Sequence, residues 1–94
     1  MTTHELKLST HYWDAVTTGQ KTFEVRYNDR GYQKGDVLIL REWGEGAYVS
    51  WGYERPWECR VTYVHSGLGM APGYVVLGIE PVVGFLPALA EVTP

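Results

Sequence analysis

Short apolar segments separated by glycine-rich turns constrain the fold of this chain most strongly. The clearest segment covers residues 21–28, in which Phe23, Val25 and Tyr27 share one face and polar residues share the other. This period of two predicts a half-buried strand. VLIL at residues 37–40 is apolar on both faces, which is typical of a strand buried on both sides, as in a small closed barrel or a covered sheet.

One segment near the start of the chain has helical rather than strand-like spacing. Ser9 or Thr10 can cap this helix, and Gly19 supplies the left-handed position that often ends one. The remaining strand-like segments are HELKL near the start, in which Leu6 and Leu8 share one face, CRVTYV in the middle and YVVLGI near the end. One short early helix and about five strands in 94 residues predict a mixed α+β domain with a barrel-like sheet.

The composition argues against several classes of site. Cys59 is the only cysteine, so an intramolecular disulfide is excluded, and we expect a reducing, cytoplasmic compartment. His4, His11 and His65 lack the paired spacing of metal ligands, so we expect no metal and no other cofactor. The amino end lacks a signal-peptide core, and the longest apolar run, residues 82–90, is too short to span a bilayer.

Charge is distributed unevenly along the chain. The formal net charge is −3, which argues against a general polyanion binder. Residues 21–41, however, hold five basic and three acidic residues, whereas the rest of the chain holds three basic and eight acidic residues. We therefore expect any anion-binding surface on this segment. Its basic residues, which we take as candidates for binding nucleic acid, are Lys21, Arg26, Arg30, Lys34 and Arg41.

The stretch GQKTFEVR at residues 19–26 gathers charges of both signs on one strand. On a regular strand Glu24 and Arg26 point to the same side, roughly 7 Å apart. That separation suits two contacts to one ligand better than a tight ion pair, and a solvated strand face is the plain alternative. Strict alternation puts Lys21 on the opposite side, whereas a turn after Gly19 brings it to the same side. The sequence is compatible with either position of Lys21.

Aromatic residues are concentrated between residues 43 and 57. Base faces pack on the rings of Trp and Tyr and on Arg planes, so exposed rings beside Arg26 or Arg41 would favour nucleic-acid recognition. We expect most of these rings to fill the core. The candidates for stacking are Trp43, Trp51 and Tyr53.

GQKTFEVR matches the G-x-K-x-x-E-x-R pattern of the ASCH domain, a branch of the PUA-like superfamily. With HELKL, KTFEVRYNDRGYQKGDVLILREW and GYVVLGI, residues 4–80 resemble an uncharacterised ASCH-like family of bacteria and phages, domain of unknown function 3850. The resemblance implies a PUA-like curved mixed pseudo-barrel of five or six strands over residues 1–80, with a helix near its start. The apolar tail, residues 81–94, is expected to dock in part or to fray.

The same resemblance implies a cleft that holds RNA or a modified nucleotide, with Lys21, Glu24 and Arg26 as its binding residues. One ASCH-like branch resembles amidohydrolases of acetylated cytidine, in which a lysine is followed three residues later by a threonine nucleophile. Glu24 stands at that place here, which favours binding over catalysis.

Two alternatives to nucleotide binding stay open. The first is a small hydrolase of a modified nucleoside or of RNA, with Lys21 and Glu24 as its acid and base. The second is a protein-interaction domain. In each case we expect a monomer or a weak dimer and no membrane partner.

Overall fold

The computed structural model describes residues 1–49 and 55–82. Its elements follow in the order β1 (Thr3–Ser9), α1 (Thr10–Thr17), β2 (Phe23–Tyr27), β3 (Val37–Gly44), β4 (Ala47–Tyr48), β5 (Trp57–Ser66) and β6 (Tyr74–Pro81). The single sheet has six strands in the order β1-β3-β5-β6-β2, with β4 paired to β3. These elements confirm the predicted α+β pseudo-barrel with one short early helix. Trp51, Tyr53 and residues 83–94 of the tail lie outside the described residues.

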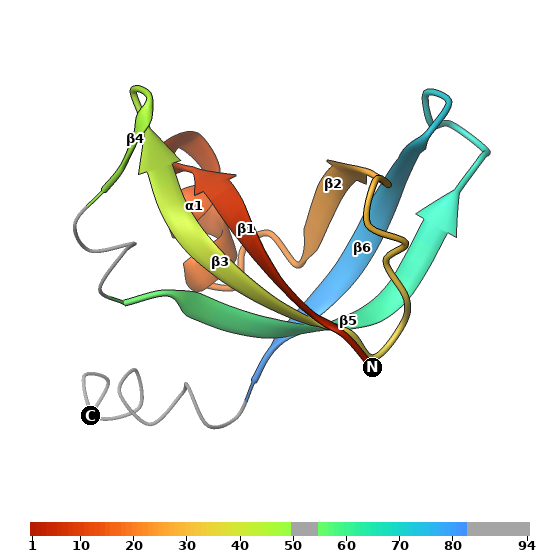
Figure 1. The fold of residues 1–94 in the computed structure, drawn as a ribbon, viewed down its shortest axis with the longest axis horizontal. Helices are drawn as coiled ribbons and strands as arrows, with labels where there is room; N and C mark the ends of the chain where they lie inside the picture. The colour runs from red at the N-terminus through yellow and green to blue at the C-terminus, as the bar shows by residue number, and fades with distance from the viewer. Residues whose placement is uncertain (50–54, 83–94) are drawn as a thin grey trace.

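The sheet curls so that its two edge strands stand on opposite arms of a V (Figure 1). β1 pairs in parallel with β3, and all the other pairs are antiparallel. β5 connects the arms because its first residues pair with β3 and most of its length pairs with β6. Within residues 1–49 and 55–82, no strand pairs with the outer edge of β1 or of β2, so the pseudo-barrel has an open seam between them.

The hydrophobic core lies on one face of the curled sheet, which we call the inner face. Alternation along β1 buries Leu6 and Leu8 there, as the sequence predicts. α1 contributes Val16, which is 1% exposed. The full cluster is Leu6, Leu8, Val16, Tyr32, Leu38, Leu40, Trp57, Cys59, Val61, Val75, Leu77 and Ile79.

Helix α1 begins and ends as the sequence predicts. Ser9 is the N-cap, and its Oγ accepts a hydrogen bond from the backbone N–H of His11 at 3.1 Å. Gly19 follows the helix with φ +83°, a conformation that costs glycine little. The helix therefore returns the chain sharply toward β2.

Strand β2 presents to the core the face that its hydropathy assigns to solvent. Glu24 is only 3% exposed, and Arg26 beside it on the inner face is half-buried. Phe23, Val25 and Tyr27 point outward and are 42% to 57% exposed. The interpretation of the charged side as a solvated face was therefore wrong. The inward charges are tolerated because they are paired with one another.

A buried polar pair fastens the first residues to the start of β3. Nε2 of His4 lies 2.9 Å from Oδ2 of Asp36. Asp36 also accepts hydrogen bonds from the backbone N–H groups of Thr2 and Gln33, both at 3.0 Å. Burial alone would raise the pKa of Asp36, but these hydrogen bonds and the nearby His4 outweigh it and lower the pKa below its ordinary value. No local pattern indicates this pair, because its members are 32 residues apart in the chain.

Candidate functional site

The three charged side chains of GQKTFEVR meet on the inner side of β2. Lys21 precedes the strand, and its backbone N–H donates to the carbonyl oxygen of Ala15 at 2.7 Å. This turn brings Nζ of Lys21 to 3.0 Å from Oε1 of Glu24. Nε of Arg26 donates to Oε2 of Glu24 at 3.0 Å, and its Nη2 lies 2.9 Å from the same oxygen. Lys21 therefore lies on the same side as Glu24 and Arg26.

Glu24 acts as a buried counter-ion for both cations. Its side chain is 4% exposed, and each carboxylate oxygen contacts one of the two basic side chains. The expectation that strand spacing disfavours a tight ion pair was wrong, because the long side chain of Arg26 spans the distance between the two positions. Two cations on one carboxylate leave the cluster with a positive charge. Charge-assisted hydrogen bonds also hold Lys21 and Arg26 in fixed positions.

Two arginines bridge the open seam of the pseudo-barrel. Nη2 of Arg26 donates to the carbonyl oxygen of Lys7 at 2.7 Å. Nη1 of Arg30 donates to the carbonyl oxygen of Glu5 at 3.1 Å. Both acceptors belong to β1, whose neighbour on its other side is β3. The guanidinium groups therefore satisfy carbonyls that a further strand would otherwise bind.

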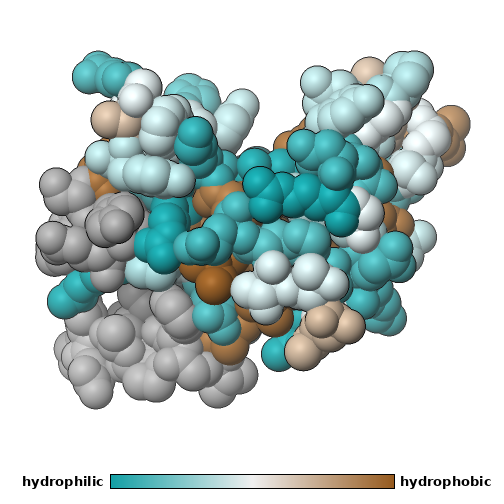
Figure 2. All heavy atoms as spheres, viewed as in Figure 1, coloured by the Kyte–Doolittle hydropathy of each residue, from teal (hydrophilic) through white to brown (hydrophobic). Residues whose placement is uncertain are grey.

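A groove of about 760 Å³ runs along this seam, and we call it the seam groove. Its walls are residues 7–9 and Tyr12 on one side, and Lys21, residues 23–27 and Tyr74 on the other. Ligand sites in proteins commonly enclose roughly 300 to 1,000 Å³. Figure 2 shows the molecule hollowed between its two arms, where much of the surface is hydrophilic. The seam groove is thus large enough for a small ligand.

Exposed aromatic rings border the cations of the seam groove. Nζ of Lys21 lies 4.5 Å from the ring centroid of Tyr12 and 4.9 Å from that of Phe23. The rings of Tyr27 and Tyr74 pack edge to face at a centroid distance of 5.4 Å. All four rings are at least 42% exposed. Sequence reasoning missed the two rings of β2, Phe23 and Tyr27, because period two defines two faces of the strand without saying which one is exposed.

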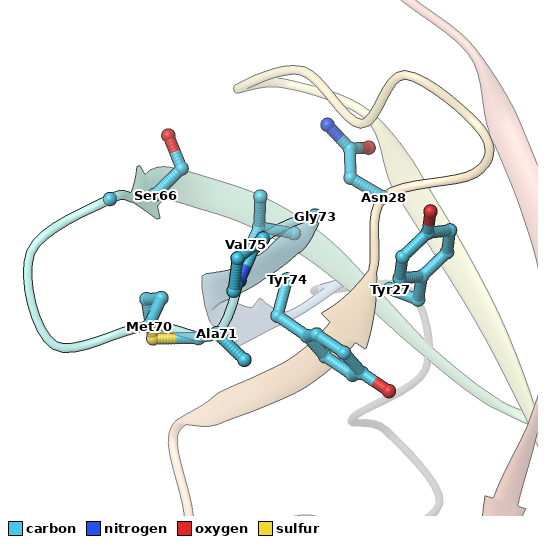
Figure 3. A pocket seen from close by; sticks show the side chains of 10 residues that line it. Tyr27, Asn28, Ser66, Met70, Ala71, Gly73, Tyr74 and Val75 are labelled. Carbon is cyan, nitrogen blue, oxygen red and sulfur yellow. The ribbon is translucent and has the colours of Figure 1, made fainter.

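A second hollow, of about 420 Å³, meets the seam groove at the pair Tyr27 and Tyr74, which lines both. Figure 3 shows Asn28, Ser66 and the loop that leads into β6 around this hollow. Gly73 in this loop has φ +85°, and a Cβ there would lie 2.5 Å from Cε1 of Tyr27. A glycine is therefore required for the tyrosine ring to pack against the loop.

The other residues expected at the site lie outside the lining of the seam groove. Arg41 forms an ion pair with Glu5, with Nη2 2.8 Å from Oε1, and borders a separate hollow of about 370 Å³. Lys34 is exposed in the turn before β3. Trp43 is half-buried, and Nζ of Lys7 lies 3.9 Å from its ring centroid. The basic segment is therefore divided between several surfaces, and Lys21 and Arg26 are its members within the groove lining.

Cys59 has the character of a core residue. Its side chain is completely buried, and burial, together with Glu24 and Glu58, raises its pKa to about 12. A thiol in this state is a poor nucleophile. Within residues 1–49 and 55–82, no group of three or more His, Cys, Asp or Glu side chains is placed to hold a metal ion. The same residues contain no helix of the length and hydropathy needed to cross a membrane.

These features define a small α+β pseudo-barrel protein with a cationic, aromatic groove at its open seam. The chain belongs to the family described as Domain of unknown function (DUF3850), whose model matches residues 3–79. It is 40% identical over 74 residues to an uncharacterized 12.9 kDa protein in the GpA 3'region of Escherichia phage P2. That match covers 79% of this chain and 64% of the relative, so the chain spans less than two thirds of the phage protein.

The fold also occurs in a known crystal structure. The structure of hypothetical protein PH0355 matches with a TM-score of 0.54 at 20% sequence identity. The match covers 87% of this chain and 100% of that one. At this identity the likeness concerns the fold alone, and it agrees with the curled sheet seen here.

Proposed function

We propose that this protein binds RNA or a modified nucleotide in the seam groove, and that its family is an ASCH-like branch of the PUA-like superfamily. The observation that carries the proposal is the cluster of Lys21 and Arg26, which are fixed on the buried Glu24 at the wall of the groove. These are the charged positions of the G-x-K-x-x-E-x-R motif. Their meeting in one groove supports both parts of the proposal.

Donor groups remain for a ligand after the internal contacts are counted. Among the described residues, Nη1 of Arg26 has no hydrogen-bond partner, and Nζ of Lys21 has one, Glu24. A guanidinium offers a planar fork and an ammonium a point charge, and both groups commonly contact phosphates. The adjacent rings of Phe23 and Tyr27 provide stacking surfaces, which contribute roughly 1 to 3 kcal/mol per base. Cations beside exposed rings are typical of single-strand binding.

The environment of Glu24 favours binding over hydrolysis. A general base must reach the proton that it abstracts. Both oxygens of Glu24 are engaged by cations, and the side chain is 4% exposed. A carboxylate held in this way serves better to position Lys21 and Arg26 than to activate water.

Fluorescence anisotropy with a fluorescein-labelled, single-stranded octauridine RNA tests the proposal. Lys21→Gln removes one groove cation and retains a hydrogen-bond donor for Glu24. We expect affinity to fall about tenfold, and the slope of log affinity against log salt to decrease by about one contact. Lys34→Gln is the matched control, because it removes an exposed lysine that is outside the groove lining.

Equal losses in the two variants would show that RNA is held by diffuse charge and not by the seam groove. If the wild-type protein binds no single-stranded RNA or nucleotide at low salt, the proposed function is wrong.

A further inference from the structure

Among the strands that the structure describes, none pairs with the outer edge of β2, and this edge borders the seam groove. At one end of the β2–β6 ladder, the N–H of Ile79 donates to the carbonyl oxygen of Thr22 at 3.0 Å. At the other end, the N–H of Asn28 donates to the carbonyl oxygen of Gly73 at 2.8 Å. The register between these ends is continuous. In an antiparallel ladder every second residue bonds to the partner strand, so the even-numbered residues of β2 face β6.

The odd-numbered residues of β2 direct their N–H and C=O groups away from β6. β2 is the last strand in the sheet order, and successive residues 23–27 all line the seam groove, which therefore follows the strand edge. The carbonyl oxygen of Tyr27 accepts a hydrogen bond from the N–H of Asp29 at 2.9 Å. Val25, at the middle of the strand, presents a donor and an acceptor side by side to the groove.

The opposite wall limits what can bind to this edge. The carbonyl oxygens of Glu5 and Lys7 on β1 are already bound by Arg30 and Arg26, whose side chains cross the seam. A complete additional strand between β1 and β2 would have to displace both bridges. A planar ring that contacts one residue of β2 leaves them in place. The geometry therefore favours a small flat group over an extended peptide.

We propose that the backbone N–H and C=O of Val25 form hydrogen bonds with the Watson–Crick edge of an unpaired base. This inference rests on the proposed function. Each of the four bases carries a hydrogen-bond donor next to an acceptor on this edge, and proteins read that edge in single strands. A base in this position lies above the guanidinium of Arg26, which crosses the seam on the inner side. Lys21 remains available for phosphate. The ligand class is thus single-stranded nucleic acid with at least one splayed base.

Proline at position 25 removes the N–H in question without breaking a ladder bond, because that N–H does not donate to β6. Proline is compatible with edge strands when the lost N–H faces away from the sheet. We expect Val25→Pro to bind octauridine about tenfold more weakly than wild type, because a polar group of the base loses its partner. Val25→Ala keeps the N–H and removes most of the side chain, so we expect it to bind octauridine more tightly than Val25→Pro, and the difference between the two variants isolates the N–H.

A second measurement uses the wild-type protein and does not depend on folding of the proline variant. An octamer of N3-methyluridine lacks the donor of the Watson–Crick edge, and a duplexed octamer hides that edge. We expect both to bind about tenfold more weakly than octauridine. Far-UV circular dichroism and thermal unfolding establish that Val25→Pro is folded.

Several outcomes would overturn the inference. Equal binding of octauridine by Val25→Pro and Val25→Ala would do so, as would equal binding of the methylated and unmethylated octamers. Binding of an extended peptide of alternating valine and glutamate, without binding of octauridine, would identify strand addition as the use of this edge. In the first two cases RNA binding itself survives, so failure of this inference is distinguishable from failure of the proposed function.

Discussion

Replacing Glu24 with glutamine tests whether this carboxylate holds the groove cations in place. The substitution keeps the size of the side chain and removes its charge. Lys21 and Arg26, whose side chains are 17% and 21% exposed, then lose their shared counter-ion. The new amide NH₂ also faces one of the two cations, which loses its acceptor on this side chain.

The expected magnitude follows from the burial of the partners. Removing one member of a buried ion pair costs roughly 3 to 5 kcal/mol. Water compensates the two partly exposed cations, and the amide oxygen remains an acceptor, so we expect the lower end of the range, about 3 kcal/mol. For a domain of this size, that loss lowers Tm by roughly 12 to 24 °C. Stabilities of small domains are about 5 to 15 kcal/mol, so the variant is expected to fold at 25 °C.

Urea denaturation followed by tryptophan fluorescence measures the free energy of unfolding. The matched control is Glu5→Gln, the same chemical change at a side chain that is 61% exposed and paired with Arg41. An exposed pair contributes about 1 kcal/mol or less, so the control is expected to lose much less stability than Glu24→Gln. Equal losses of below about 1 kcal/mol in both variants would refute the counter-ion role of Glu24.

Two further predictions concern groups away from the groove. Because the pKa of Asp36 is lowered in the folded state, its contribution to stability is present above its unfolded pKa, near 3.9, and is lost as the pH falls through the folded value. Asp36→Asn is therefore expected to be less stable than wild type at pH 7, and its free energy of unfolding is expected to fall less steeply between about pH 5 and pH 2 in urea titrations. An equally steep fall in both proteins would contradict this. The pKa of Cys59 is about 12, so we expect native protein not to react with a thiol reagent at pH 8 and unfolded protein to react fully; rapid labelling of the native protein would contradict its burial.

Local patterns were sufficient to predict most of the elements. The N-cap Ser9 and the left-handed Gly19 predicted both ends of α1, because they act on backbone groups of the same few residues. Period-two alternation likewise predicted β1, with Leu6 and Leu8 buried. These signals depend on residues that are close in sequence, so they can be recognised without knowledge of the tertiary structure.

The candidate site was predicted only in part. The motif drew attention to Lys21, Glu24 and Arg26, and the structure brings all three together. The exposed rings of Tyr12 and Tyr74 were missed, because they enter the seam groove from α1 and β6, which are distant in sequence. Local charge and aromatic content could not reveal that convergence.

Local sequence patterns were sufficient to predict the components of the charged cluster, namely a strand of period two with Glu24 and Arg26 on one side and a turn at Gly19 before Lys21. The inward orientation of this charged side, in contrast, depends on the tertiary structure. Alternation has no preferred face until the strand is placed in a sheet. The position of β2 at the edge opposite β1 then sets Arg26 across the seam, where it reaches the carbonyl oxygen of Lys7. Pairing with both cations makes the burial of Glu24 tolerable. Because the charged side of β2 faces inward, its apolar side is exposed along the groove.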